Sequence, residues 1–242
     1  MPAPAEEAEL PPVVLLHGCG GAAHATFQAT GLSDVLRAAG RTPLLVDLPG
    51  HGRSDNSGDP ADYADLAGML EPRLPDRPFD AVGYSLGGKL LLELAIRSPG
   101  RIGRMVLGGV GDNVFAPEGV AEAAARALET GPADDTPPPV LAFLKTWDAR
   151  QNDARAVAAV LRRPPNPVFT EARLAAVQTE VLLVNGDADP AARDSARLRS
   201  ALPGADLLSL AGVDHFGLPA SAAFVRAAAD FLAFPSPARR AS

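Results

Sequence analysis

A serine lies between two glycines in the segment GYSLGG, residues 83–88, where an apolar run gives way to a helical pattern. The spacing fits G-x-S-x-G, in which the serine occupies a strained strand-to-helix turn and exposes its hydroxyl. The flanking Gly83 and Gly87 lack the Cβ atoms that would collide across such a turn. Ser85 is therefore predicted to be a nucleophile, rather than an inert residue in an ordinary connection.

A serine hydroxyl is a poor nucleophile unless a base takes its proton, and the base needs a carboxylate to orient it. The chain has four histidines, His17, His24, His51 and His215. Only His215, in AGVDHFGLP, follows the last predicted strand and precedes the final helix, so its loop returns to the sheet edge that carries the serine. We predict that His215 is the base, whereas His17 and His51 fit better as buried structural histidines.

Several aspartates could orient this histidine. Asp189, in NGDADP, follows another predicted strand at the same sheet edge and is our first choice. Asp112, at the end of RMVLGGVGD, comes second because its loop also opens onto that edge. Asp187 ranks third, since an aspartate in a turn often bonds its own backbone or caps a helix. Asp214 is expected to face away from its neighbour in the sequence.

An oxyanion hole needs two preorganised N–H donors where negative charge develops. Leu86, directly after the serine, offers one at a helix start. The loop HGCGG, residues 17–21, can bring a second, for which we choose Cys19 and keep Gly20 as the alternative. The glycine-rich surroundings suit Cys19 as a backbone donor rather than as a thiol nucleophile. Neither G-x-G-x-x-G nor the P-loop pattern occurs here, so nucleotide binding is not expected.

Short apolar runs must form the strands that position these residues. They are continuous rather than alternating, which is typical of strands buried on both faces of a parallel sheet. The expected strands are 13–17, 44–48, 81–84, 105–108, 181–185 and 205–210, and the expected helices between or after them are 27–39, 86–97, 191–201 and 220–232. Strand and helix in alternation predict an α/β fold with a doubly wound, mostly parallel open sheet of about six strands.

One region interrupts this alternation. Residues 112–178 have helical patterns, proline-rich joints and no convincing strand. We therefore expect residues 1–111 and 179–242 to form the core, and residues 112–178 to form a helical cap or lid inserted into it. Long insertions are often functional, although extra packing helices without a gating role are the alternative.

The amino-acid composition limits the classes of partner that the protein can have. The 242 residues are 47% hydrophobic, and the net charge of −7 argues against a nucleic-acid partner. The single cysteine allows no internal disulfide, and the first residues lack the basic and apolar pattern of a secretory signal. No apolar run reaches membrane-spanning length. We expect a cytoplasmic protein without membrane contact, metal or cofactor; the sequence leaves its oligomeric state open.

Five motifs together resemble the α/β-hydrolase superfamily, over most of the chain from Val13 to Leu232. They are LLHGCGG (15–21), DLPGHGRS (47–54), GYSLGG (83–88), NGDADP (185–190) and GVDHFG (212–217). The likeness is strongest to cofactor-free serine esterases and the related C–C bond hydrolases and perhydrolases. It implies that DLPGHGRS is a structural turn without a catalytic role. Members usually begin with a β-hairpin, for which this chain leaves little room, so a shortened, wholly parallel sheet is expected.

The expected activity is hydrolysis of a small or medium carboxylic ester through an acyl-enzyme on Ser85, Asp189 and His215. The alternatives are a C–C bond hydrolase, thioesterase or lactonase on the same triad, and a small-molecule binding protein that kept the fold without turnover. Aromatic residues near the elbow, in the insertion or beside the histidine are candidates for the substrate pocket; besides Tyr84, they are Phe27, Phe115, Phe143, Trp147 and Phe216.

Overall fold

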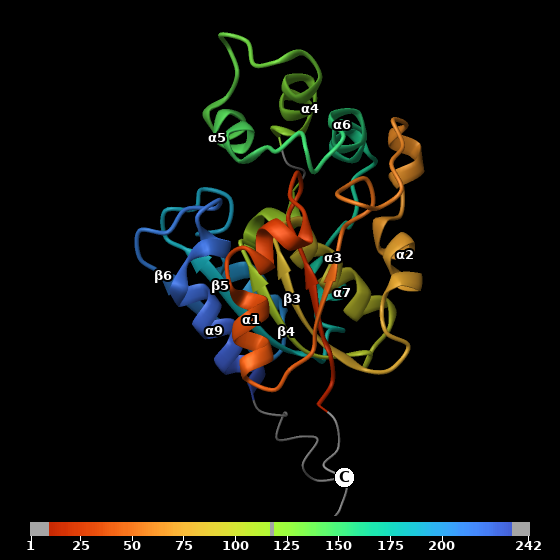
Figure 1. Ribbon diagram of the computed structural model, residues 1–242. Helices are drawn as coiled ribbons and strands as arrows, with labels where there is room; N and C mark the ends of the chain where they lie inside the picture. Colours follow the sequence, from red (N-terminus) through yellow and green to blue (C-terminus); the bar gives the residue numbers. More distant parts are fainter. Residues whose placement is uncertain (1–9, 117–118, 234–242) are drawn as a thin grey trace, which may run out of the picture.

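The computed structural model describes residues 10–116 and 119–233, and Figure 1 shows a central sheet between helices with a further helical group above it. In these residues, parallel strands form one six-stranded sheet in the order β2-β1-β3-β4-β5-β6. The strands are β1 (Val13–Leu16), β2 (Pro43–Val46), β3 (Phe79–Tyr84), β4 (Ile102–Gly108), β5 (Glu180–Gly186) and β6 (Ala205–Leu210). The predicted doubly wound parallel sheet is confirmed. Residues 1–9, which bear on the expected lack of an N-terminal hairpin, lie outside the described residues.

Helices cover both faces of the sheet, as the continuous apolar strands require. On one face lie α1 (Leu32–Ala38) and α9 (Ala222–Ala233), which pack against each other. The other face carries α2 (Leu66–Leu70), α3 (Leu86–Arg97), α7 (Glu171–Leu174) and α8 (Ala196–Ala201). Each face has its own apolar cluster, and β1 and β3 in the middle are buried along their whole length. The two clusters fix the strand ends that carry the site.

Two expected helices begin later than the sequence pattern suggests. The segment expected to start at Phe27 first forms a short π-helical turn, His24–Gln28, and α1 starts only after Gly31. Gly31 has a φ of 87°, a left-handed conformation that ends a right-handed helix. The helix expected from Ala191 begins at Ala196. The short helix α2, between β2 and β3, was not predicted.

The insertion is helical, and its described residues contain no strand. Helices α4 (Ala121–Thr130), α5 (Pro138–Thr146) and α6 (Ala154–Arg162) stand above the carboxyl ends of the strands (Figure 1). We call these three helices and their connections the cap. They share a small apolar cluster around Val140, and Arg162 joins α6 to two glutamates of α4. Helix α7 instead packs against α3 and α8 in the layer below, so the expected 112–178 segment also includes a core helix.

In the described residues, no helix combines the length and apolar character needed to cross a membrane.

Candidate active site

Ser85 occupies the sharp turn between β3 and α3. Its φ of 52° and ψ of −116° make it the one described non-glycine residue with a positive φ. A Cβ on Gly83 would lie 2.6 Å from the Cα of Gly88, and a Cβ on Gly87 would collide with the carbonyl oxygen of Leu16. Both glycines are therefore required by close backbone approach. The strained turn expected from G-x-S-x-G is present, and it exposes part of the serine at the carboxyl edge of the sheet.

His215 lies between Ser85 and Asp189 and contacts both. Its Nδ1 is 2.7 Å from an Oδ2 of Asp189, and its Nε2 is 3.1 Å from the Oγ of Ser85. Because an ionised carboxylate only accepts hydrogen bonds, Nδ1 carries the proton and donates a hydrogen bond to Asp189. This leaves the Nε2 lone pair directed at the serine hydroxyl. The three residues thus have the geometry of a nucleophile, its base and the carboxylate that orients the base.

The Asp189 carboxylate is held by its own turn as well as by the histidine. Its side chain has no exposed surface. Oδ1 accepts the backbone N–H groups of Ala191 at 2.8 Å and Ala192 at 3.2 Å, while Oδ2 faces His215. The carbonyl of Asp189 also accepts the N–H of Arg193 at 2.9 Å, so a single turn follows the acid before α8 begins at Ala196.

The three other candidate aspartates have structural contacts and do not reach the histidine. Asp112 accepts the N–H of Leu198, in the first turn of α8, at 2.8 Å and therefore caps the N-terminus of that helix. Asp187 accepts the N–H of Gly212 at 2.7 Å, and Asp214 accepts that of Gly217 at 2.7 Å. Each carboxylate stabilises a turn or a helix end, which is the common use of aspartate that the sequence analysis weighed for Asp187.

A tight glycine turn lies beside the serine. The N–H of Gly21 donates to the carbonyl of Gly18 at 3.1 Å, and Gly20, the third residue of the turn, has a φ of 74°. A positive φ at that position is the requirement of a type II turn. A Cβ on Gly18 would lie 3.2 Å from the Cβ of Ser85, so the turn runs directly along the nucleophile. A side chain at Gly18 would collide first with the ring of Tyr84, which lies 2.8 Å from the position of its Cβ.

Leu86 and Cys19, the two predicted oxyanion donors, lie on elements next to Ser85. The prediction of Gly20 as an alternative donor is wrong. Leu86 is the first residue of α3, where N–H groups have no acceptor within the helix. Cys19 is the second residue of the glycine turn. The N–H of Gly20 donates to Nε2 of His51 at 2.9 Å, so it is not available to an oxyanion. The alternative Gly20 is therefore set aside, and Cys19 and Leu86 stay predictions.

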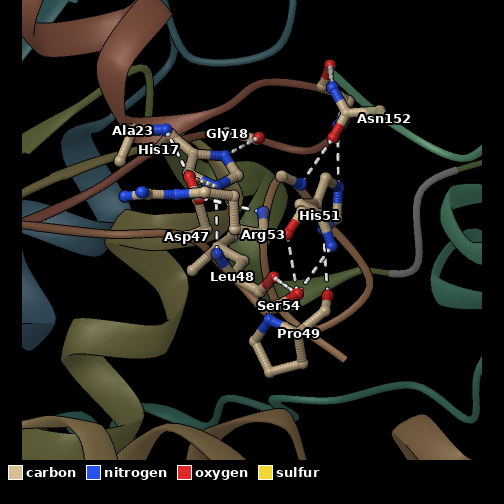
Figure 2. Close-up of polar contacts among 12 residues, drawn as sticks. His17, Gly18, Ala23, Asp47, Leu48, Pro49, His51, Arg53, Ser54 and Asn152 are labelled. Carbon is tan, nitrogen blue, oxygen red and sulfur yellow. Dashed lines mark hydrogen bonds and ion pairs between the residues drawn. The ribbon is translucent and has the colours of Figure 1, made fainter. Parts of the chain in front are cut away.

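His17 and His51 are buried structural residues that join the glycine turn to the loop 47–54 (Figure 2). His17 accepts the N–H of Leu48 at Nε2 (3.0 Å), and its Nδ1 lies 2.7 Å from the carbonyl of Gly18. The Nδ1 of His51 lies 2.9 Å from the carbonyl of Pro49. Burial lowers the pKa of His17 to about 4 and that of His51 to about 3. Both rings are therefore neutral at physiological pH, which their acceptor role requires.

Two of the aromatic residues predicted to line the substrate pocket, Phe27 and Phe115, have their main contacts elsewhere. Phe27 has no exposed surface and belongs to the apolar cluster on the α1 and α9 face of the sheet. Its choice as a pocket residue was wrong, because it is the one buried side chain of the turn His24–Gln28 and packs into the core. Phe115 lies partly buried below the guanidinium of Arg197, whose Cζ is 3.8 Å from the ring centroid. This cation–π pair occupies one face of the ring.

The remaining candidates are partly buried, and two of them are close to the site. Phe143 of α5 covers the glycine turn, since a Cβ on Gly20 would overlap its ring. Phe216 meets the ring of His215 edge-on, with centroids 5.3 Å apart. Trp147 follows α5 in the cap. Phe143 and Phe216 are therefore the aromatic candidates whose contacts with the turn and the histidine the structure establishes.

Sequence reasoning missed two polar residues that hold the strand ends in place. Tyr84, considered only as a pocket aromatic, donates its hydroxyl to the carbonyl of His215 at 2.8 Å. Asn185 is buried, and its amide bonds the N–H and the carbonyl of Val110 and the hydroxyl of Ser195. Asn185 thus ties the loop after β4 to the loop that contains the acid. The available signal in the sequence was an asparagine at the end of a continuous apolar run, EVLLVNG.

Comparison with known sequences adds a family likeness. The sequence model of the alpha/beta hydrolase family matches residues 13–228. The pimeloyl-(acyl-carrier protein) methyl ester esterase of Aromatoleum aromaticum is 38% identical over 155 residues, which are 60% of this chain and 58% of that relative. The 2-hydroxy-6-oxononadienedioate/2-hydroxy-6-oxononatrienedioate hydrolase of Cupriavidus pinatubonensis is 36% identical over 112 residues, 43% of this chain and 39% of that relative. The matched segments span about a third to three fifths of the curated relatives' lengths.

Solved structures extend the likeness to the whole fold. The enol-lactonase from Burkholderia xenovorans LB400 superposes with a TM-score of 0.71 at 21% identity, covering 95% of this chain and 94% of the lactonase. At this identity the superposition shows a shared fold.

Proposed function

We propose that this chain, which belongs to the α/β-hydrolase family, is a serine hydrolase that cleaves small or medium carboxylic esters through an acyl-enzyme intermediate. The observation that carries the proposal is the contact of His215 with both Ser85 (3.1 Å) and Asp189 (2.7 Å). Esterase and hydrolase relatives support the reaction class, and the strained, partly exposed serine supports its role as the attacking group.

In the first half of the reaction, the Oγ of Ser85 attacks the ester carbonyl while Nε2 of His215 takes the hydroxyl proton. Asp189 keeps the imidazole in the required tautomer and stabilises the imidazolium that forms. The N–H groups of Cys19 and Leu86 bind the oxyanion of the tetrahedral intermediate. The intermediate collapses to the acyl-enzyme when the alcohol leaves with the proton from His215.

In the second half, a water molecule attacks the acyl group on Ser85, and His215 takes one of its protons. A second tetrahedral intermediate forms at the same N–H groups. It releases the carboxylic acid, and the serine regains its proton from the imidazolium. Every step uses groups of the protein and water.

We further propose that the cap acts as a lid over the site and limits the acyl group. Its position above the carboxyl ends of the strands supports this role, as does the packing of Phe143 on the glycine turn beside Ser85. Phe143 and Phe216 are the aromatic residues that we expect to contact the acyl chain.

A C–C bond hydrolase or lactonase on the same residues is the second candidate. It is favoured by the Cupriavidus pinatubonensis relative, which is 36% identical and is named as a hydrolase of 2-hydroxy-6-oxononadienedioate and 2-hydroxy-6-oxononatrienedioate, although that match covers less of the chain than the esterase match does. Both reactions need the same nucleophile, base and oxyanion donors, so the distinction lies in the substrate.

A substrate panel tests the proposal. Purified protein and Ser85→Ala would be assayed with p-nitrophenyl acetate and butyrate, a lactone, an acyl-CoA and a ring-cleavage dienone. We expect the highest kcat/KM with an ester, at least about tenfold above the other classes, and no turnover above background for Ser85→Ala. A preference for the dienone or the lactone would establish the second candidate. Absence of turnover with every substrate would contradict hydrolysis and favour a binding protein.

A further inference from the structure

Asn152 of the cap reaches down to the glycine turn beside the nucleophile (Figure 2). It lies just before α6, and only 7% of the residue is exposed. Its Nδ2 donates to the carbonyl of Gly20 at 3.0 Å, and its Oδ1 accepts the N–H of Gly52 at 3.0 Å. A single buried amide of the cap therefore bonds both the glycine turn and the loop 47–54.

Gly20 is restrained from three directions. Its N–H donates to His51, its carbonyl accepts from Asn152, and its Cα packs against the ring of Phe143. Two of these three restraints, Asn152 and Phe143, come from the cap. The sequence separation between Asn152 and Gly20 is 132 residues.

These restraints matter because glycine by itself does not favour one turn conformation. Gly20 has a φ of 74°, and glycine populates positive and negative φ about equally. Partners on both sides of the residue therefore help the Gly21–Gly18 hydrogen bond to select the type II turn. The same turn contains Cys19, whose N–H is our proposed second oxyanion donor. An N–H donor stabilises an oxyanion only when it is aimed at the oxygen beforehand.

We propose that Asn152 is a positioning residue through which the cap sets the geometry of the oxyanion hole. This inference rests on the proposed function for its kinetic consequence, but not for its structural one. When the cap is in place, Asn152 holds the carbonyl of Gly20 and the turn presents Cys19 to the reacting oxygen. When the cap moves away, the Gly20 carbonyl loses its donor, the turn keeps only its bonds to His51 and at the Gly18 carbonyl, and the hole loosens.

The Asn152 amide donates to one partner, Gly20, and accepts from the other, Gly52, so variants can remove one or both hydrogen bonds. Asn152→Ala removes both hydrogen bonds. Asn152→Asp keeps an acceptor for Gly52 but has no donor for Gly20, and it retains the size of the side chain. The neighbouring Gln151, which donates to Asp148 at 2.9 Å, provides the matched control Gln151→Ala within the same cap segment.

Amide hydrogen exchange measures, without any substrate, whether Asn152 stabilises the glycine turn. We expect exchange in residues 17–23 to rise about tenfold in Asn152→Ala and Asn152→Asp, and to stay at the wild-type rate in Gln151→Ala. Thermal melting verifies that each variant is folded. If exchange in these residues is unchanged in the folded Asn152 variants, the proposal is wrong, whether or not the protein is an esterase.

A kinetic comparison then tests the oxyanion hole itself. A p-nitrophenyl ester and its thionoester, with sulfur in place of the carbonyl oxygen, differ in the atom that the N–H groups bind. For the Asn152 variants we expect kcat to fall about 10- to 100-fold with KM within about threefold, and the ester-to-thionoester ratio to fall at least about fivefold. A kcat that falls equally for both substrates would contradict a role through the hole. Wild-type inactivity toward all esters would contradict the proposed function, and the exchange result would still decide the coupling.

Discussion

The hydroxyl of Tyr84 donates to the backbone carbonyl of His215 at 2.8 Å, and their rings lie 5.2 Å apart. This contact joins the residue before the nucleophile to the loop that carries the base. The end of β3 thus positions Ser85 through the turn and His215 through a side-chain hydrogen bond. The distance between nucleophile and base therefore depends on a residue that takes no proton in the proposed reaction.

Tyr84→Phe tests this link. The substitution leaves the ring in place and removes the donor to the His215 carbonyl, which costs about 1 kcal/mol of stability. We expect kcat for p-nitrophenyl butyrate to fall about 3- to 10-fold, because the imidazole is less well positioned. Tyr63→Phe is the matched control, since its hydroxyl bonds Ser57 away from the site. It should lower the melting temperature with kcat within about twofold. Equal kcat effects of the two variants would exclude a specific role for Tyr84.

Asp189→Asn tests the choice of acid. An amide at this position no longer enforces the histidine tautomer with Nε2 free, so we expect kcat to fall about 10⁴-fold. Asp112→Asn should instead weaken the hydrogen bonds at the N-terminus of α8. This should lower stability by about 1 kcal/mol and leave kcat within about threefold of wild type. Steady-state kinetics and urea unfolding of both variants separate these effects. The assignment fails if Asp112→Asn is inactive while folded and Asp189→Asn keeps near wild-type activity.

Much of this site could be predicted from the sequence because its residues follow strands that end at one sheet edge. The positions of Ser85, Asp189 and His215 all follow from that rule of parallel sheets. The choice among Asp189, Asp112 and Asp187 could not be derived, since it depends on which way each carboxylate turns. The contacts made by the carboxylates with local N–H groups decide it in the structure.

Other features depend on contacts between residues that are far apart in the sequence. The Gly20 donor was excluded by His51, 31 residues away, and Asn152 acts on the same glycine over 132 residues. Neither pairing leaves a local pattern. Phe27 was misplaced for a related reason, because an apolar residue near a site and one in the core look alike in the sequence.

Acid should destabilise the protein through His17 and His51. Burial lowers their folded-state pKa to about 4 and about 3, whereas the unfolded chain protonates histidine near 6.5. The unfolded state therefore binds more protons below pH 6.5, so the stabilising contribution is complete above that pH and is lost as the pH falls toward 3. The two pKa values fall by about 2.5 and about 3.5 units, and one unit corresponds to about 1.4 kcal/mol, so the loss is on the order of 8 kcal/mol by pH 3.

Urea unfolding between pH 7.5 and 4 measures this loss. His51→Gln keeps an acceptor near Gly20 but does not titrate, so its stability should decline less steeply below pH 6.5. If the two proteins lost stability in parallel over that range, His51 would not be buried in its neutral form.

Asp80 should matter for stability and not for activity. It is buried at the start of β3, the end opposite to Ser85, and pairs with Arg41 at 2.7 Å and Arg104 at 3.2 Å. Asp80→Asn leaves two buried arginines without their counter-charge, which is expected to cost about 3–5 kcal/mol. The exposed pair of Asp34 with Arg37 gives the control Asp34→Asn, with an expected change under about 1 kcal/mol. Urea unfolding measures the free energy of unfolding of both variants, and a decrease of similar size in both would refute this account. The kcat of the folded fraction should be unaltered in either variant.

The central claim is that Ser85 is a nucleophile activated by His215, and covalent labelling with a fluorophosphonate tests it most directly. Intact-mass and peptide analysis would compare wild type, Ser85→Ala and His215→Ala. We expect one phosphonyl group per wild-type chain, located on the peptide that contains Ser85. Labelling should be absent in Ser85→Ala and at least about 100-fold slower in His215→Ala. A wild-type protein that is not labelled, or a label that persists in Ser85→Ala, would contradict the account.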